Sequence, residues 1–221
     1  MPTDPSEMPT SWEMPAFPLG SVLLPGQLMA LQVFEPRYRV MLFDLREADP
    51  IEFLVTLIVR GSEVGGGDVR SDVGCVARVT AMADQPDGRV LLEVVGDRPL
   101  AVLEWLTEDP YPVARVADVP SANTAVEATA EPSDELRRAL ELDEELAGSM
   151  RRLGLSVPQR PAPAGALEEM IWQLALRSPI GTLDRQRLLE AADVDTRLSL
   201  LVATMQEQSE LLSARLAMEG D

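Results

Sequence analysis

Three short pieces of sequence decide the fold: FPL at residues 17–19, LPG at 24–26 and VFEPRY at 33–38. The first two predict short apolar strands broken at Pro25-Gly26, since proline and glycine favour turns. The third predicts a helix that begins at Pro36, because the proline ring presets φ and its missing N–H needs no partner in a first turn. Apolar side chains then recur on one face of that helix, at Tyr38, Met41, Leu42 and Leu45. The helix is therefore expected to lie against a sheet.

The chain from residue 16 to 119 is predicted to be a small β-barrel or rolled sheet, preceded by a flexible tail over residues 1–15. The tail is rich in proline, serine, threonine and acidic residues. The helix is expected to stop near Ala48, before Asp49-Pro50. Strand-like apolar runs then follow at 51–59, 73–83, 89–95, 99–106 and 113–119. Turn signals at 85–88 and at Gly96-Asp97 separate them, and Gly74 predicts a bulge or a close backbone approach.

The remainder of the chain is predicted to be a linker over 120–132 and a helical domain over 133–219. The linker holds mainly alanine, threonine, serine and glutamate, which leaves little to bury. After it the apolar period becomes helical, with Ser133, Thr182 and Asp193 as helix caps, which predicts a four-helix bundle-like domain. The last helix has its apolar stripe at Val194, Leu198, Leu201, Met205, Leu212 and Leu216. The stripe favours packing within this domain, and a homodimer through this helix is the alternative.

Composition excludes much of catalytic chemistry. The 221 residues carry a net charge of −18, and all 19 basic residues are arginine, with no lysine and no histidine. Nucleophile–base pairs that need lysine or histidine, P-loop lysines and histidine-ligated zinc are therefore impossible within this sequence. The single cysteine, Cys75, lies in an apolar run and is expected to be a small buried residue rather than a nucleophile. We expect no enzyme activity, no cofactor and no metal.

The charge balance also bears on partners and location. An acidic chain lacks the basic surface that phosphate backbones need, so we expect no DNA binding, and the acidity argues against RNA. The sequence has no basic, apolar leader and no apolar stretch long enough to cross a bilayer, which needs about 20 residues. We therefore expect a cytoplasmic protein that does not bind membranes.

The order of motifs resembles the N-terminal, substrate-binding domain of Lon proteases. The resemblance begins with residues 17–45 and continues through Val73-Gly74-Cys75-Val76-Ala77 and Asp87-Gly88-Arg89. It returns in the helical part at 183–190 and 193–198. It implies an α+β fold, a PUA-like β pseudobarrel followed by a C-terminal helical bundle. Lon proteases also carry an ATPase and a Ser–Lys peptidase, and neither can be present in a sequence without lysine, so the resemblance is to a stand-alone, bacterial substrate-binding domain.

The resemblance implies a non-catalytic module of protein quality control that binds peptides. Its partners would be unfolded polypeptides or a specific protein. The candidate partner-binding motif is Phe34, Glu35, Pro36, Arg37 and Tyr38. These residues have an equally simple structural interpretation, in which Glu35 and Arg37 fix the strand–helix junction and Tyr38 packs. A small-ligand or RNA-binding PUA-like domain is the alternative function.

Overall fold

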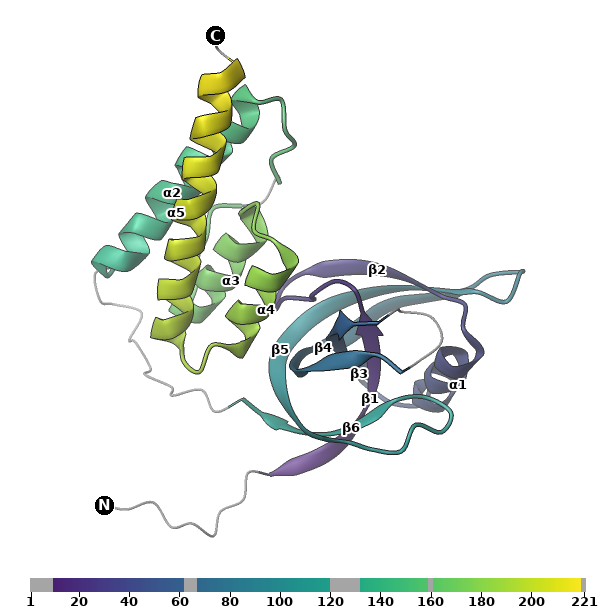
Figure 1. Cartoon of the computed structure of the whole chain (residues 1–221). Coiled ribbons are helices and arrows are strands. Elements are labelled where there is room, and N and C mark those ends of the chain that lie inside the picture. The colour runs from purple at the N-terminus through teal and green to yellow at the C-terminus, as the bar shows by residue number, and fades with distance from the viewer. Residues whose placement is uncertain (1–9, 62–66, 120–131, 159–160, 220–221) are drawn as a thin grey trace, which may run out of the picture. The chain divides into compact units, whose positions relative to one another are not determined.

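A computed structural model describes residues 10–61, 67–119, 132–158 and 161–219. The chain divides into two compact units, one ending at Val119 and the other beginning at Pro120. We call them the barrel unit and the helical unit and describe each by itself (Figure 1). The α+β fold class predicted from the sequence is confirmed. Of the predicted linker, only Pro132 lies within the described residues, and so does only the last part of the predicted tail.

The barrel unit is a six-stranded sheet that closes on itself. Its elements are β1 (Ser11–Leu19), β2 (Leu28–Val33), α1 (Pro36–Leu45), β3 (Glu52–Arg60), β4 (Val69–Asp84), β5 (Val90–Trp105) and β6 (Val113–Asp118). The strand order is β2-β5-β4-β3-β1-β6, and β6 also pairs with β5, which closes a ring of five strands. β1 and β3 run parallel, and the other pairs are antiparallel. Among the described residues β2 pairs only with β5, so it is the end strand of this sheet.

Apolar side chains from five strands fill the ring. The main cluster consists of Met14, Ala16, Leu54, Val76, Leu100, Ala114 and Val116, with Trp12, Val102 and Trp105 packed against it. Buried side chains alternate with more exposed ones over residues 13–16 of β1 and 113–116 of β6, as expected where one face of a strand lies on a core, whereas residues 16–19 of β1 are all buried. The barrel unit therefore has a continuous apolar core of its own.

The boundary of the tail was wrong by several residues. The sequence predicted a flexible tail over 1–15, whereas β1 begins at Ser11 and residues 11–15 pair with 113–117 of β6. The segment looks polar in sequence. Its apolar side chains are those of Trp12 and Met14, and Met14 is buried in the core. This apolar alternation is too short to predict a strand by itself, and pairing with β6 stabilises it.

The predicted turn at Gly96-Asp97 is also absent, because β5 runs without interruption from Val90 to Trp105. Gly96 serves a different purpose. A Cβ at this position would lie 2.1 Å from the carbonyl oxygen of Leu24, so the loop after β1 crosses β5 at a point where only glycine fits. Gly74 shows the close approach that was predicted, since a Cβ there would lie 2.5 Å from the carbonyl oxygen of Val55.

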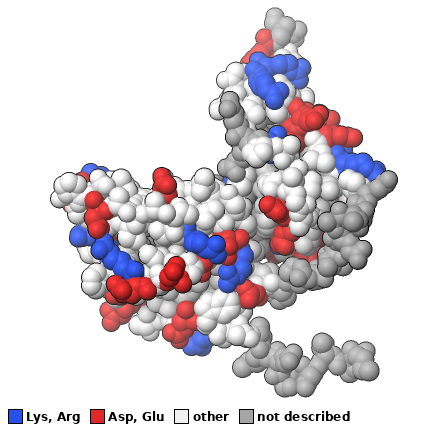
Figure 2. Space-filling view, turned by 180° about the vertical axis from the view of Figure 1, so that it is seen from behind, with Lys and Arg blue, Asp and Glu red and all other residues white. Residues whose placement is uncertain are grey.

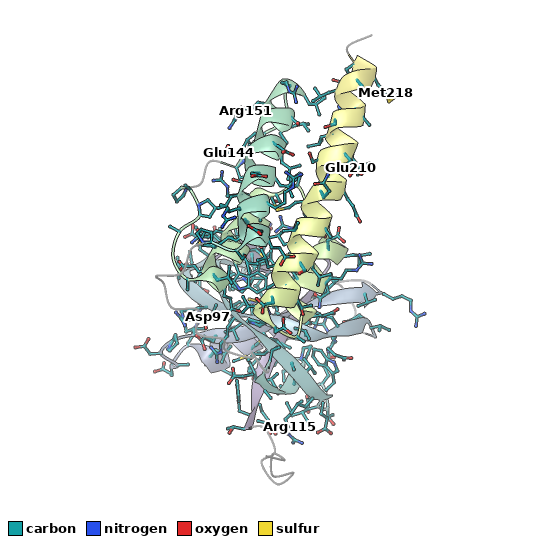
Figure 3. All side chains as sticks on the ribbon, turned by 90° about the vertical axis from the view of Figure 1, so that its left-hand side faces the viewer. Asp97, Arg115, Glu144, Arg151, Glu210 and Met218 are labelled. Carbon is teal, nitrogen blue, oxygen red and sulfur yellow. The ribbon has the colours of Figure 1, made fainter. Side chains whose placement is uncertain are left out.

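The described residues of the helical unit form four helices: α2 (Asp134–Arg152), α3 (Leu167–Arg177), α4 (Thr182–Glu190) and α5 (Val194–Glu219). Two predicted caps are confirmed: Ser133 Oγ accepts from Leu136 N at 3.1 Å and Asp193 Oδ1 accepts from Thr196 N at 2.7 Å. The third was wrong, because Thr182 is the first residue of α4 and the N-cap is Gly181, with no side-chain cap hydrogen bond. Figures 1 and 3 show α5 side by side with α2, and α5 also contacts α3 and α4. Buried leucines of all four helices form the core of this unit.

Candidate functional site

The strand–helix junction at Glu35–Tyr38 joins the edge of the sheet to α1. α1 begins at Pro36 as predicted, and its first backbone hydrogen bond runs from Arg39 N to Glu35 O at 3.1 Å. Tyr38 points inward and is 2% exposed, with its ring 4.3 Å from that of Phe17. The guanidinium of Arg37 lies 4.6 Å from the centre of the Tyr38 ring. The Tyr38 ring therefore holds the junction through two contacts, an aromatic contact with Phe17 and a cation–π contact with Arg37.

Five charged side chains form a chain of ion pairs at this junction, which we call the junction network. Arg37 donates to Glu35 at 3.1 Å and to Glu108 at 2.6 Å. Glu108 also accepts from Arg70 at 3.1 Å, and Arg70 donates to Asp68 at 2.5 Å. Alternating charges thus connect α1 to β4 and to the segment between β5 and β6.

The electrostatics of the network suit a structural joint. Burial raises the pKa of Tyr38 to about 12, so the phenol keeps its proton at neutral pH. Burial opposes ionisation of Asp68, but the hydrogen bond from Arg70, a backbone hydrogen bond and the charges of Arg70 and Arg37 together outweigh it and lower the pKa of that carboxyl. Neither group exchanges protons near neutral pH, and a general acid or base needs a pKa near the working pH. The junction network ties the start of α1 to β4 and to the segment between β5 and β6 through ion pairs.

The five residues of the sequence-predicted site do not share one surface. Tyr38 is in the core, and Pro36 starts α1. Glu35 and Arg37 are engaged with each other, with only 17% and 16% of their side chains exposed. Phe34 alone presents a large apolar surface, at 55% exposure. The geometry gives Tyr38, Arg37 and Glu35 structural contacts and leaves Phe34 and Pro36 as the exposed members of the motif.

A second feature is a concave surface between α1 and the turn that connects β4 to β5, which we call the α1–hairpin groove. Its volume is about 530 Å³. It is lined by Pro36, Arg39, Val40, Leu42, Phe43, Arg46, Asp84, Gln85, Gly88, Arg89 and Val90. Val40 and Phe43 are 42% and 71% exposed, so an apolar surface is open to solvent there. Exposed apolar surface that borders a groove is typical of binding sites.

Arginines surround this apolar surface. Arg46 holds both carboxylate oxygens of Asp84 at 2.8 Å, and Arg89 pairs with Asp87 at 2.5 Å. Arg39 lies beside Gly88, where its guanidinium would be 3.5 Å from a Cβ. The groove lining thus has three arginines and one acid, although the whole chain is strongly acidic. Figure 2 shows positive and negative side chains next to one another on the visible face of the barrel unit.

Our sequence reasoning missed this groove, although one signal was available. Val40 and Phe43 lie outside the apolar stripe of α1 that faces the sheet, and two large apolar residues on a solvent face need a reason. The partner wall comes from the β4–β5 turn, about forty residues further along the chain. The local sequence of α1 does not predict that wall.

A third feature is a smaller pocket beside the end strand, which we call the β1–β2 pocket. Its volume is about 190 Å³. It is lined by Phe17, Pro18, Leu19, Ala30, Leu31, Gln32, Phe34, Glu35 and Tyr38. The lining is mainly apolar, and its one charged member, Glu35, is paired with Arg37. An apolar side chain would fit its chemistry.

Two other kinds of site find no support within the described residues. Cys75 is fully buried and burial raises the pKa of its thiol, which makes it a poor nucleophile. In the described parts of the chain, no group of three or more Cys, Asp or Glu residues is placed to hold a metal ion. None of the helices in those parts is long and apolar enough to span a membrane.

Comparisons with known proteins give a consistent result. The family model of the ATP-dependent protease La (LON) substrate-binding domain matches residues 13–207. The chain is 26% identical over 213 residues to a Lon protease of Heliobacterium modesticaldum, covering 92% of this chain and 25% of that protein. It is 27% identical over 205 residues to Lon protease 2 of Myxococcus xanthus, covering 90% and 24%. The chain thus spans about a quarter of the length of these curated relatives.

Solved structures also resemble most of this chain. The crystal structure of a Lon N-terminal domain protein from Xanthomonas campestris matches with a TM-score of 0.64 and 26% identity, covering 87% of this chain and 98% of that one. The N-terminal domain of a Mycobacterium avium complex Lon protease matches with a TM-score of 0.60 and 16% identity, covering 88% and 98%. At 16% identity the second likeness concerns the fold alone.

Proposed function

Because this chain belongs to the LON substrate-binding domain family, we propose that it is a non-catalytic module that binds unfolded segments of other proteins. We place it in cytoplasmic protein quality control in bacteria. The observation that carries the proposal is the α1–hairpin groove, where Phe43 and Val40 present open apolar surface. Unfolded chains expose apolar side chains that folded proteins bury, so a permanently exposed apolar groove recognises the unfolded state.

The chemistry of the barrel unit supports binding without catalysis. The printed sequence has no lysine and no histidine, and its one thiol is buried with a raised pKa. Tyr38, the most shifted phenol, holds its proton because it is buried in the core. The much longer relatives are named as proteases, and we do not propose proteolysis for this chain.

The test uses the full chain and a probe that cannot fold. The probe is a disulfide-rich protein that has been reduced, capped with iodoacetamide and labelled with fluorescein, and its anisotropy is measured as this protein is added. Phe43→Ala should weaken binding about tenfold or more, since an aromatic side chain buried in an interface is typically a hot spot. Leu103→Ala is the matched control, because Leu103 is also exposed, at 52%, but does not line the groove.

Two results would contradict the proposal. No change in anisotropy at any protein concentration would refute polypeptide binding. Equal weakening by Phe43→Ala and Leu103→Ala would refute the groove as its site. The same labelled protein before reduction, still folded, serves as the negative probe.

A second candidate function is supported by the arginines of the groove. Arg39, Arg46 and Arg89 could bind the phosphates of a small anionic ligand or of RNA. Asp84 and Asp87 already neutralise two of these arginines, which makes this function the weaker proposal. Filter binding with labelled RNA at low salt tests it: retention that decreases steeply with added salt would favour RNA over polypeptide.

The homodimer through α5 stays a prediction. Leu211 and Met218 of α5 are 63% and 82% exposed, so the helix carries apolar side chains beyond those it buries (Figure 3). Sedimentation velocity over a range of concentrations would detect a dimer. Loss of that dimer in Leu211→Glu, compared with Leu103→Glu, would assign it to α5.

A further inference from the structure

We propose that β2 accepts an extended segment of a polypeptide as an added strand, with one apolar side chain of that segment in the β1–β2 pocket. The inference rests on the proposed function, because its ligand is a polypeptide. It goes further in stating how an extended segment of that polypeptide is held at a site apart from the α1–hairpin groove, through backbone hydrogen bonds to a sheet edge.

The first support is the sheet topology. Five strands close into a ring, in which every strand has a neighbour on both sides over part of its length. β2 is different, because within the described residues it pairs only with β5, in register from Leu28 opposite Val95 to Val33 opposite Val90. Its other edge therefore presents backbone N–H and C=O groups without a strand partner. An extended peptide is the ligand whose own backbone groups complement such an edge.

The second support is the sequence of β2, which lacks the usual protection of an edge strand. Natural edge strands carry charges, prolines or bulges that prevent pairing with other chains. The six residues Leu28–Val33 (LMALQV) contain no charge and no proline, and their register with β5 has no shift. Leu28 is 72% exposed. β2 runs along the top of the barrel in Figure 1, and Figure 2 shows mostly uncharged surface over that upper part from behind.

The third support is the position of the β1–β2 pocket. Ala30, Leu31 and Gln32 of β2 form one wall, and Phe17–Leu19 of β1 form another. Phe34, an exposed member of the junction motif, borders the same pocket. Side chains of an added strand alternate between the two faces of a sheet, so every second residue would lie on the side of this pocket.

These features together specify the ligand. The pocket is mainly apolar, and its one acid is neutralised by Arg37, so an uncharged apolar side chain suits it. Backbone hydrogen bonds to β2 do not depend on sequence, which suits recognition of many unrelated unfolded chains. The predicted specificity is therefore an extended segment with apolar residues at alternate positions.

Backbone methylation of a peptide tests the proposal directly. The probe is a fluorescein-labelled peptide of about eight residues that alternates threonine and valine, with one central leucine. Two further versions carry N-methyl groups on alternate residues, one set on each edge of the extended chain. In an added strand only one edge faces β2, so one methylated version should lose about tenfold or more in affinity while the other binds as the parent does. Amide exchange over residues 28–33 should slow when the parent peptide is present.

Two phenylalanine variants of the full chain separate this site from the groove. Phe34→Ala should weaken peptide binding, and Phe43→Ala, the matched control on the same unit, should not. Equal binding of both methylated versions would overturn the proposal, while capture of the unfolded probe through Phe43 would leave the proposed function intact. Absence of peptide binding in all versions would also overturn it. Protection of the β2 amides that rises with protein concentration alone would show a second copy of the chain on this edge instead, and would overturn it as well.

Discussion

Replacing Tyr38 with alanine should destabilise the barrel unit strongly, and the size of the effect follows from its surroundings. Tyr38 is 2% exposed, its ring lies 4.3 Å from Phe17, and Arg37 lies over it at 4.6 Å. Truncating a buried aromatic side chain to alanine costs about 3–5 kcal/mol of unfolding free energy. The ring of Phe17 also lies 5.9 Å from that of Phe53, so the cavity would open at the end of a row of three aromatic rings.

Native-state hydrogen exchange with mass spectrometry measures this loss unit by unit. Amides of β3, a strand paired on both sides, exchange when the barrel unit unfolds. A loss of about 3–5 kcal/mol should speed their exchange by about two to three and a half orders of magnitude, at tenfold per 1.4 kcal/mol. Tyr38→Phe is the matched control, since it keeps the ring and should change the rate by less than about tenfold.

The outcome distinguishes the two interpretations of the junction motif. If Tyr38→Ala changes β3 exchange by less than about tenfold, the ring does not belong to the core and the reasoning is wrong. Peptides from α5 serve as the internal reference, because that helix belongs to the separate helical unit. Loss of polypeptide binding in Tyr38→Ala without faster exchange would instead assign Tyr38 to the binding surface.

Three further predictions follow from the barrel unit. Gly96→Ala should reduce stability more than Gly148→Ala, measured by urea unfolding, because a Cβ at Gly96 would meet the Leu24 carbonyl whereas one at Gly148 meets nothing within 4 Å; equal stability would show that the crossing loop yields easily. The lowered pKa of Asp68 means that its stabilising contribution is present above its unfolded value, near pH 4, and is lost as the pH falls through the folded value. The stability difference between the parent and Asp68→Asn should therefore be largest at neutral pH and shrink on acidification below about pH 4, and a difference that is constant with pH would contradict the pairing with Arg70. Cys75 should react with a thiol reagent at neutral pH only after the protein is unfolded, because burial raises the pKa of its thiol, and rapid labelling of the native protein would show that the strand opens.

Local signals in the sequence were enough for most elements. Pro36 placed the start of α1, and Ser133 and Asp193 placed two helix starts, because capping chemistry acts within a few residues of the cap. The prediction of a turn at Gly96-Asp97 failed because the deciding contact is not local. A glycine in a strand and a glycine in a turn look alike locally, and the carbonyl that decides between them, that of Leu24, lies far away in the chain.

The site was less predictable than the fold. Residues 34–38 are adjacent in sequence, yet Tyr38 enters the core while Phe34 faces solvent, and helix geometry alone does not say which will be open. The partners of Arg37 and Arg70 are even harder to find. Glu108 lies between two strands, with no fixed spacing to either arginine, and only the closure of the barrel brings the three together.

The stacked arginines limit which basic residue can occupy three positions of the chain. Arg37, Arg70 and Arg197 each lie over an aromatic ring, at 4.6, 4.7 and 4.6 Å, while also holding a carboxylate. A planar guanidinium can do both at once, whereas the ammonium of lysine is a compact charge that cannot stack in the same way. An arginine-to-lysine change would therefore preserve the charge at these positions and lose the geometry. At these three positions the shape of the cation therefore matters as much as its charge.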